Sequence, residues 1–452
     1  MKKLALCLIC STIALLGASH LQSAEQSEPV VDIEIFSWML GSADEDNVER
    51  KMIELYQQLN PHVNITITEV PENQSYNDLL VARAQIGDLP DVFTWDDNIE
   101  AITNGWVTDL TPYVTIDSEW NNVLEPLRQG ATYNDHTFFL PFRSYLMGMF
   151  INNDIYDENN LEHLKFGYTM DELLYAIDQT TTDTTKGTGN YFPVELFYPM
   201  VEDPDTYCYA TYQPYSNTVD FTTDLYARGV EIYKTITENN NNLVNTSTEE
   251  FFGRNGWAFG EIGGIGNQYE GTWFFDSDYK INADYIGLPN GIAGVLVNDY
   301  YCIGANSDVA EQAYEFVKFM SFGLNGVRNR LYLHEINPTQ YGFKGVPVIA
   351  GANAVIDTKY ISAFSMYPNY ISAYQSIDTA KLEGLKEIPG LSMAINDNTI
   401  EPYKMWELRD AITHGNKNLN NYDIEMTELA NQVLANYNEQ LKKTMGIPSS
   451  DA

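Results

Sequence analysis

The sequence predicts an α/β protein built as two domains, and three observations support this prediction. Extended apolar segments alternate with helical segments from the start, over Val31–Trp38, Val48–Leu59 and Val63–Ile67. Such alternation is typical of a mostly parallel sheet that helices cover on both faces. The 452 residues are too many for one ordinary core, so two domains of about 150–220 residues are expected. The apolar content of 44% and charged content of 19% are typical of a globular protein.

Each early element has a local signal. Apolar and polar residues alternate in Val31–Trp38, which predicts a half-buried strand. Apolar residues then recur at helical spacing in Val48–Leu59, until Pro61 ends the pattern. Val63–Ile67 alternates again as a second strand, and Tyr76–Ile86 follows as a helix.

The later part of the chain continues this pattern. Thr169 and Glu172 form a capping box that opens a helix reaching Ile177. Tyr300 and Tyr301 are neighbours in an extended run, so we expect one to face the core and the other a ligand cleft. The remaining predicted helices cover 221–238, 309–322 and 424–442, and the extended runs cover 285–288 and 294–303.

The first residues are typical of a secretory signal. Lys2 and Lys3 precede the apolar run Leu4–Gly17, which is shorter than the roughly 20 residues that a membrane span needs. We therefore expect residues 1–24 to be a cleaved signal peptide and the protein to be exported, to a periplasmic or extracellular location. Cys10 lies too early in the apolar run to carry a lipid, so a lipid anchor is not expected.

Removal of the signal would leave two cysteines, Cys208 and Cys302. We interpret them as two buried free thiols, with one disulfide as the alternative.

The charge balance excludes two classes of partner. The formal net charge is −38 and the isoelectric point is near 4.2. Nucleic-acid binding and attachment to anionic lipid both require basic patches, so neither is expected. The same balance permits a cationic ligand such as a polyamine.

Known catalytic and metal-binding motifs are missing from the sequence. The histidines beyond the signal are not paired at metal-ligand spacing, and HExxH, GxSxG and GxxxxGK[ST] do not occur. We therefore expect no catalytic residue, metal or cofactor. Because acidic pairs are frequent, a secreted carbohydrate-degrading enzyme with two carboxylates stays open as an alternative.

The stretch Gly87–Asn98, GDLPDVFTWDDN, is the most informative candidate site. Its apolar run predicts a short buried strand that ends in a loop carrying Trp95, Asp96 and Asp97. Ligands of open α/β sheets lie beyond the carboxyl ends of strands, where this loop is expected. An indole stacks on the C–H face of a sugar, and carboxylates accept hydroxyl protons. The alternative is a tryptophan packed at a sheet edge beside solvated acids.

The order of several short motifs carries a family resemblance. FSW in the first strand, GDLPDVFTWDD, FLP at 139–141, FINND at 150–154 and the TMDELLYAI helix follow one another at consistent spacing. This series resembles the extracellular solute-binding proteins of ABC importers, family 1, to which the maltose-binding protein belongs. The glycine-rich GEIGGIGNQ lacks the tryptophan of that protein, so the resemblance does not transfer maltose as the ligand.

The resemblance implies a type II periplasmic-binding-protein fold, in which two helix-flanked lobes are joined by three crossovers. Mapped by motif, the crossovers fall near Pro141–Tyr145, Ala293–Asp299 and Lys344–Val348. The implied lobes are 32–141 with 296–345, and 142–292 with 350–446.

The resemblance also implies the function. The protein is expected to be a non-catalytic, monomeric binding subunit that takes a sugar or oligosaccharide between its lobes and delivers it to a membrane permease. Trp95 is the best candidate for stacking, with Trp406 or Tyr191 opposite it. The full set of predicted ligand-binding residues is Trp38, Trp95, Asp96, Asp97, Asn98, Tyr145, Tyr191, Phe192, Glu261, Asp299 and Trp406.

Overall fold

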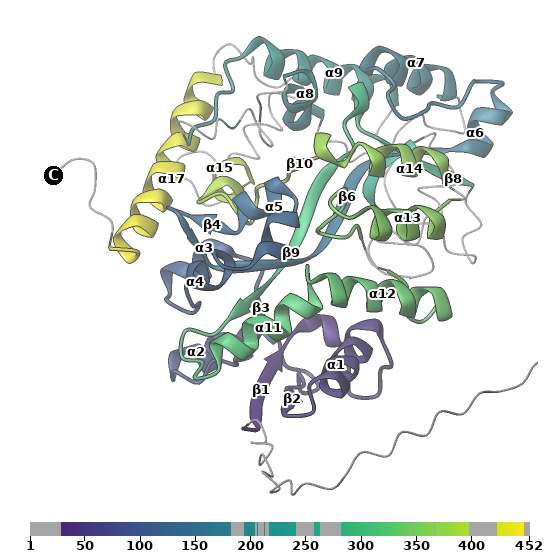
Figure 1. Cartoon of the computed structure of the whole chain (residues 1–452). Coiled ribbons are helices and arrows are strands. Elements are labelled where there is room, and N and C mark those ends of the chain that lie inside the picture. The colour runs from purple at the N-terminus through teal and green to yellow at the C-terminus, as the bar shows by residue number, and fades with distance from the viewer. Residues whose placement is uncertain are drawn as a thin grey trace, which may run out of the picture.

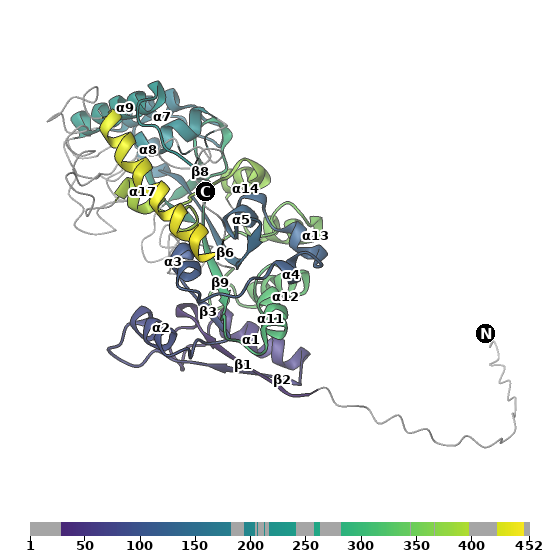
Figure 2. The same ribbon diagram turned by 90° about the vertical axis from the view of Figure 1, so that its left-hand side faces the viewer.

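The computed structural model confirms the α/β class, with helices packed around a central sheet (Figure 1). In Figure 2 the half that carries β1 and α1 lies below the half that carries α7 and α9, and β6 and β9 run between them. The structure describes residues 29–181, 194–203, 206, 212, 217–240, 257–262, 282–343, 345–365, 367–396 and 423–446.

The sheet has the order β2-β1-β3-β9-β6-β7, with β10 beside β9 and β8 beside β6. Its strands are β1 (Val31–Phe36), β2 (Val63–Ile67), β3 (Val92–Thr94), β6 (Phe139–Asn152), β7 (Trp257–Ile262), β8 (Ala283–Gly287), β9 (Val295–Ile303) and β10 (Lys381–Leu382). A separate hairpin pairs β4 (Thr132–Tyr133) with β5 (His136–Thr137). β1 pairs in parallel with β2 and β3, as the strand–helix alternation predicts. Every antiparallel pair in the large sheet involves β6 or β9, the two long strands in its middle.

The helices that the sequence predicts are present within a few residues of their predicted bounds, and the structure adds others, such as α12, α13 and α14, that the sequence analysis does not predict. The α-helices are α1 (Val48–Leu59), α2 (Tyr76–Gln85), α3 (Asn98–Thr103), α4 (Thr111–Val114), α5 (Glu125–Gly130), α6 (Asn153–Glu158), α7 (Met170–Thr180), α8 (Val194–Glu202), α9 (Asp224–Asn240), α11 (Ala310–Met320), α12 (Leu324–Ile336), α13 (Ala354–Ala363), α14 (Pro368–Gln375), α15 (Leu391–Asn396) and α17 (Asp423–Thr444). Short 3-10 helices are η1 (Trp38–Leu40), η2 (Ser118–Asn122), η4 (Pro289–Gly291) and η5 (Ile377–Thr379).

Capping side chains set where these helices begin. The Asn47 side chain accepts a hydrogen bond of 3.0 Å from the Arg50 backbone N–H and opens α1. Thr169 and Glu172 form the predicted capping box at the start of α7. Both arrangements satisfy backbone donors that the first helical turn leaves without partners.

The larger hydrophobic core surrounds β1 and β3 and is covered by α1, α11 and α12. It continues along β6 and β9 as far as α13 and α14, where α14 packs against β8. This core includes residues on both sides of the predicted lobe boundary near residue 345. The boundary therefore stays a prediction.

The smaller core lies in the other half, between the outer ends of β6 and β8 and the helices α7, α9 and α15. The last long helix, α17, contributes to both cores. Met426 and Leu434 pack in the smaller core, whereas Leu441 packs in the larger one and the helix also contacts α3.

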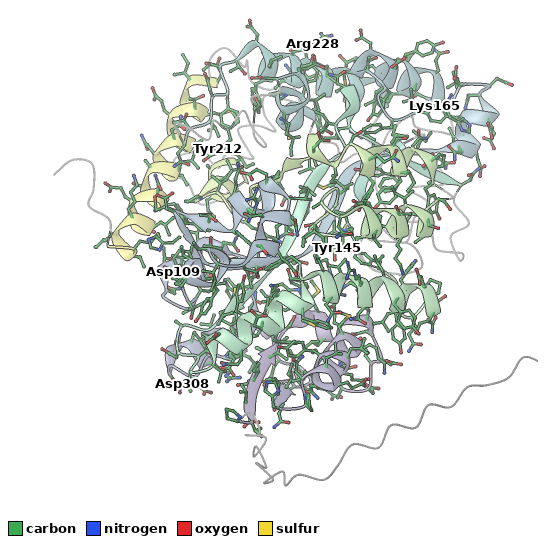
Figure 3. All side chains as sticks on the ribbon, in the orientation of Figure 1. Asp109, Tyr145, Lys165, Tyr212, Arg228 and Asp308 are labelled. Carbon is green, nitrogen blue, oxygen red and sulfur yellow. The ribbon has the colours of Figure 1, made fainter. Side chains whose placement is uncertain are left out.

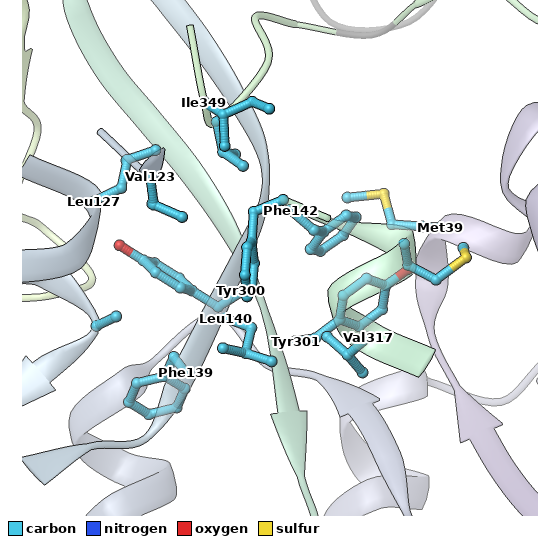
Figure 4. Close-up of a cluster of buried hydrophobic side chains, with 14 of the residues drawn as sticks. Met39, Val123, Leu127, Phe139, Leu140, Phe142, Tyr300, Tyr301, Val317 and Ile349 are labelled. Carbon is cyan, nitrogen blue, oxygen red and sulfur yellow. The ribbon is translucent and has the colours of Figure 1, made fainter. Parts of the chain in front are cut away.

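Tyr300 and Tyr301 project to opposite sides of β9, as their positions in a strand require (Figure 4). The prediction that one of them faces a cleft is wrong, because both side chains are fully buried. Tyr301 stacks on Phe142 with ring centroids 3.9 Å apart, and Tyr300 lies beside Val123 and Leu127. Protein covers both faces of the sheet at this point.

Cys302 is a buried free thiol, as predicted. Cys208 lies outside the described residues.

Candidate ligand-binding site

Two strands end side by side at one edge of the sheet. β1 and β3 run parallel, and Phe36 is paired in register with Phe93. The residues that follow these strands, Ser37–Trp38 and Trp95–Asn98, therefore lie at the same edge, where α/β proteins bind ligands. The prediction of a short buried strand before Trp95 is confirmed.

Trp38 is the accessible aromatic side chain at this edge. It lies on η1, is partly exposed, and meets the ring of Tyr76 edge to face at 5.0 Å. The Tyr76 ring stacks on Phe36 at 4.3 Å, and its hydroxyl lies 2.9 Å from the Phe36 carbonyl oxygen and 2.8 Å from that of Thr94. Burial raises the pKa of Tyr76, so its hydroxyl stays protonated and its one hydrogen is shared between these two carbonyls. Tyr76 thus joins the two strand ends and supports the indole of Trp38.

Trp95 is packed into the protein. Its side chain is 5% exposed, its Nε1–H donates to Glu100 Oε2 at 3.2 Å, and its ring meets Trp106 edge to face at 5.2 Å. The indole Nε1–H and one part of the ring are therefore already in contact with Glu100 and Trp106.

Ser144 in β6 joins three chain segments that were predicted as crossovers. Its hydroxyl donates to Asn298 Oδ1 of β9 at 2.5 Å, and its carbonyl accepts a 2.7 Å bond from the Val346 backbone N–H. The pairing of Arg143 with Asp299 places β6 and β9 in register here. The neighbouring Tyr145 lies near the centre of the molecule in Figure 3.

Gly345 allows the third segment to approach this closely. Its φ is +72°, and a Cβ atom there would lie 2.1 Å from the Ser144 carbonyl oxygen. Only glycine fits a position that combines this backbone angle with such a close approach. The Tyr360 hydroxyl donates to the Gly345 carbonyl at 2.8 Å and fixes the turn from the other side.

Arg143 connects these segments to the strand-end edge. Its Nη1 lies 2.6 Å from the sulfur of Met39 in η1, and its Nη2 lies 3.3 Å from Glu49 Oε1. Glu49 also forms a bidentate ion pair with Arg330, at 2.7 and 2.9 Å. The three charged side chains are buried, so α1, α12 and β6 are held together beside the residues that follow β1.

Comparison with known proteins identifies the family. The family model described as bacterial extracellular solute-binding protein matches residues 41–321. The chain belongs to this family. No curated protein matches the chain.

Solved structures of similar fold agree with this assignment. One is the cyclic alpha-maltosyl-1,6-maltose binding protein from Arthrobacter globiformis, with a TM-score of 0.66, 16% identity, and coverage of 90% of this chain and 100% of that chain. Another is a solute-binding protein from Thermotoga lettingae bound with alpha-D-tagatose, with a TM-score of 0.63, 14% identity, and coverage of 90% and 100%. A third is an ABC substrate-binding protein from Listeria monocytogenes in complex with cycloalternan, with a TM-score of 0.60, 15% identity, and coverage of 93% and 100%. These matches confirm the two-lobed fold.

The acidic residues after Trp95 in this solute-binding protein differ in what they do. Asp97 caps α3, because its carboxylate accepts a 2.8 Å bond from the Glu100 backbone N–H, while burial raises its pKa. Asn98 is buried and donates to the Tyr133 hydroxyl at 3.2 Å. Asp96 is exposed at the same edge.

At the predicted crossovers, Asp299 forms an ion pair of 3.0 Å with Lys386, and Tyr145 is buried. The carboxylate of Asp299 therefore already has a cationic partner within the protein. Lys386 also donates to the Asn298 carbonyl at 3.2 Å. Sequence reasoning missed Lys386, because nothing near residue 386 in the sequence indicates that it reaches β9.

Four predicted residues cannot be compared with this geometry. Tyr191, Phe192 and Trp406 lie outside the described residues. Glu261 lies on β7, where its backbone pairs with Met147, and its side chain is outside the described part of the chain.

The described residues contain no group of three or more His, Cys, Asp or Glu side chains that could hold a metal ion. Within the same residues, no helix is long and apolar enough to cross a membrane. The family consists of solute-binding proteins, so this chain is not an enzyme.

Proposed function

We propose that this protein is the sugar-binding subunit of an ABC importer and that it holds a neutral mono- or oligosaccharide between its lobes. The single observation that carries the proposal is the accessible indole of Trp38, supported by Tyr76 where β1 and β3 end. Aromatic faces stack on the C–H faces of sugars, and rigid support keeps such a platform oriented before the ligand arrives.

Two of the acidic residues near this edge favour a neutral ligand over a cationic one, while the third, Asp96, is exposed. Asp299 is paired with Lys386, and Asp97 caps α3. A cation would have to compete with these partners, whereas sugar hydroxyls can share carboxylate lone pairs. Tagatose, cycloalternan and cyclic maltosyl-maltose, named with the similar structures, are neutral carbohydrates.

The bound sugar would be enclosed by rotation of the lobes about the segments that meet at Ser144. Arg143 and Met39 link those segments directly to η1, which carries Trp38. A ligand contact at Trp38 therefore lies next to the hinge. Closure would present a defined surface to the membrane permease.

Further parts of the proposal rest on the sequence. Residues 1–24 would be removed on export without lipid attachment, and the mature chain would act as a monomer. Its lobes would be 32–141 with 296–345, and 142–292 with 350–446.

Thermal-shift screening against neutral mono- and oligosaccharides tests the function, since a ligand at 100 times its Kd stabilises the protein by about 2.7 kcal/mol. Trp38→Ala should weaken binding of the best sugar by about 1–3 kcal/mol. Tyr175→Ala is the matched control, because Tyr175 is exposed on α7, away from the strand ends. The absence of any stabilising sugar would overturn the proposal. Cleaved products would indicate an enzyme, and binding that weakens steeply with salt would indicate a cationic ligand.

A further inference from the structure

A groove of about 650 Å³ lies on the half of the molecule that carries β1. It is formed by the end of α1, the first residue of β2, α11 and the start of α12, which lie close together in both ribbon views (Figures 1 and 2). Val63, at the amino end of β2, lines it. Trp38 and Trp95 follow the carboxyl ends of strands, so the groove and the proposed sugar site lie at opposite edges of the sheet.

The floor of the groove is apolar. Tyr56 and Phe319 line it with ring centroids 5.2 Å apart. The Leu59 side chain also lines the groove and is 55% exposed, although Met52, Ile53 and Tyr56 of the same helix are buried. An exposed leucine on an aromatic floor offers a contact for an apolar side chain of a partner.

One wall of the groove is acidic. Glu311 and Glu315 lie one turn apart on α11, about 6 Å from each other at Cβ. Neither carboxylate has a hydrogen bond or ion pair among the described residues. Burial raises the pKa of Glu315, and neighbouring carboxylates add to this effect while Lys318 opposes it. A cation placed here would add to the partial compensation that Lys318 gives and would pair with carboxylates that make no ion pair among the described residues.

The other charged groups of the groove already have partners. Glu119 Oε2 accepts a 2.8 Å bond from the Leu324 backbone N–H at the start of α12. Lys318 forms a 2.7 Å ion pair with Asp117. The described residues also hold no group of three or more His, Cys, Asp or Glu side chains that could bind a metal ion. The unmatched charge is thus spread along α11 at the spacing of successive basic side chains in a peptide.

We propose that this groove docks a basic segment of a partner protein, which places Lys or Arg side chains on Glu311 and Glu315 and an apolar side chain against Leu59, Tyr56 and Phe319. Charge complementarity selects the basic residues, and the apolar floor selects a peptide over an inorganic cation. The segment would be displayed outside the cytoplasm, where this extracellular family acts.

The test uses two peptides labelled at the N-terminus, fluorescein-KLKKLLK-amide and its glycine-matched form fluorescein-KGKKGGK-amide, with fluorescence anisotropy at low and physiological ionic strength. The leucine peptide should bind more tightly than the glycine peptide. The double variant Glu311→Gln/Glu315→Gln should weaken it by about fivefold, the loss expected for two partly exposed ion pairs.

The control Glu428→Gln/Glu439→Gln removes the same charge from exposed positions of α17 and should leave binding unchanged. Equal weakening in both double variants, or equal affinity for the two peptides, would mean diffuse attraction to an acidic protein and would overturn the proposal. Displacement of the peptide by spermidine with the same dependence on Glu311 and Glu315, and no preference for leucine, would overturn it in favour of a small polyamine. Sugar binding should be the same in all variants, so this test is independent of the proposed transport function.

Discussion

The Ser144 hydroxyl donates a 2.5 Å hydrogen bond to the side-chain oxygen of Asn298, and both residues are buried. The two residues belong to different crossover strands, so this bond connects the segments about which the lobes would rotate. The Asn298 amide nitrogen donates to the Asp299 carbonyl at 3.0 Å, which fixes the orientation of the amide.

Ser144→Ala should lower the free energy of unfolding by about 1–3 kcal/mol, because it leaves the amide oxygen of Asn298 buried without this donor. Chemical denaturation measures the change. Ser372→Ala is the matched control, since Ser372 makes an exposed bond to its own helix backbone and its loss should have little effect. Similar losses in the two variants would contradict the importance of the Ser144 bond.

Gly345→Ala should destabilise the protein more than Gly105→Ala. Both glycines have similar positive φ angles, +72° and +67°, so both substitutions carry about 1 kcal/mol of backbone strain. A Cβ at Gly105 meets no atom of the described residues within 4 Å, whereas one at Gly345 would overlap the Ser144 carbonyl. We expect a total loss of about 3 kcal/mol at Gly345. Equal melting temperatures for the two variants would show that the third segment can move away without cost.

Glu49→Gln should lower stability by about 3–5 kcal/mol, because it removes the carboxylate that the buried guanidinium groups of Arg143 and Arg330 share. Glu69→Gln serves as the comparison. Glu69 pairs with Arg50 near the surface, so this substitution should lower the free energy of unfolding by less than about 1 kcal/mol. If the two substitutions shifted the denaturation midpoint by the same amount, the greater burial of Glu49 would not explain its effect on stability.

Glu387 makes stability depend on pH. Its side chain is 4% exposed, Oε1 accepts a 3.0 Å bond from the Tyr300 hydroxyl, and Oε2 has no hydrogen-bond partner in the part of the chain that the structure describes. Burial raises the pKa of Glu387 to about 7, against the opposing effect of Lys386. Between about pH 4.5 and 7 the unfolded chain loses this proton while the folded protein keeps it, so the free energy of unfolding falls as pH rises.

Glu387→Gln removes this titration while keeping an acceptor for Tyr300. Relative to the wild type it should gain stability as pH rises from about 4.5 to 7, by about 3 kcal/mol over the whole window. Burial also raises the pKa of Asp284 to about 6, but that contribution is common to both proteins and cancels in the difference. A difference between the two proteins that does not change with pH would refute this assignment.

Trp95→Ala should mainly affect stability, with a loss of about 3 kcal/mol or more, because the indole packs on Trp106 and donates to Glu100. Trp38→Ala should mainly affect sugar affinity. Denaturation and calorimetric titration of both variants separate the two roles. The reverse pattern, with Trp95 controlling affinity in a fully stable protein, would support the stacking role that the sequence predicts for it.

The sequence predicts β3 and its loop well, because Pro90 and the acidic residues bound a short apolar run on both sides. It does not predict the environment of the loop. Trp106, which contacts Trp95, follows α3 in the sequence. The Tyr76 hydroxyl contacts the carbonyl groups of Phe36 and Thr94, which are 40 and 18 residues away. Local patterns carry no information about contacts at that separation.

The buried charges show the same limit. Glu49 lies 94 residues from Arg143 and 281 from Arg330, and each is an ordinary charged residue in its own segment. Only the folded chain brings them together. Asn98 and Asp97 were predicted to contact ligand from their position alone, whereas their nearest partners, Tyr133 and the start of α3, depend on how the loop turns.

The helix α17 has its first turns in one core and Leu441 in the other. Rotation of the proposed lobes would therefore bend this helix or shift its last turns against α3, and either movement would change packing far from any bound solute. The free-energy cost of repacking α17 would offset part of the free energy gained from solute contacts. The affinity that is measured for a sugar would then depend on side chains of α17 that never touch it, and two related proteins with identical contact residues could differ in affinity through this helix alone.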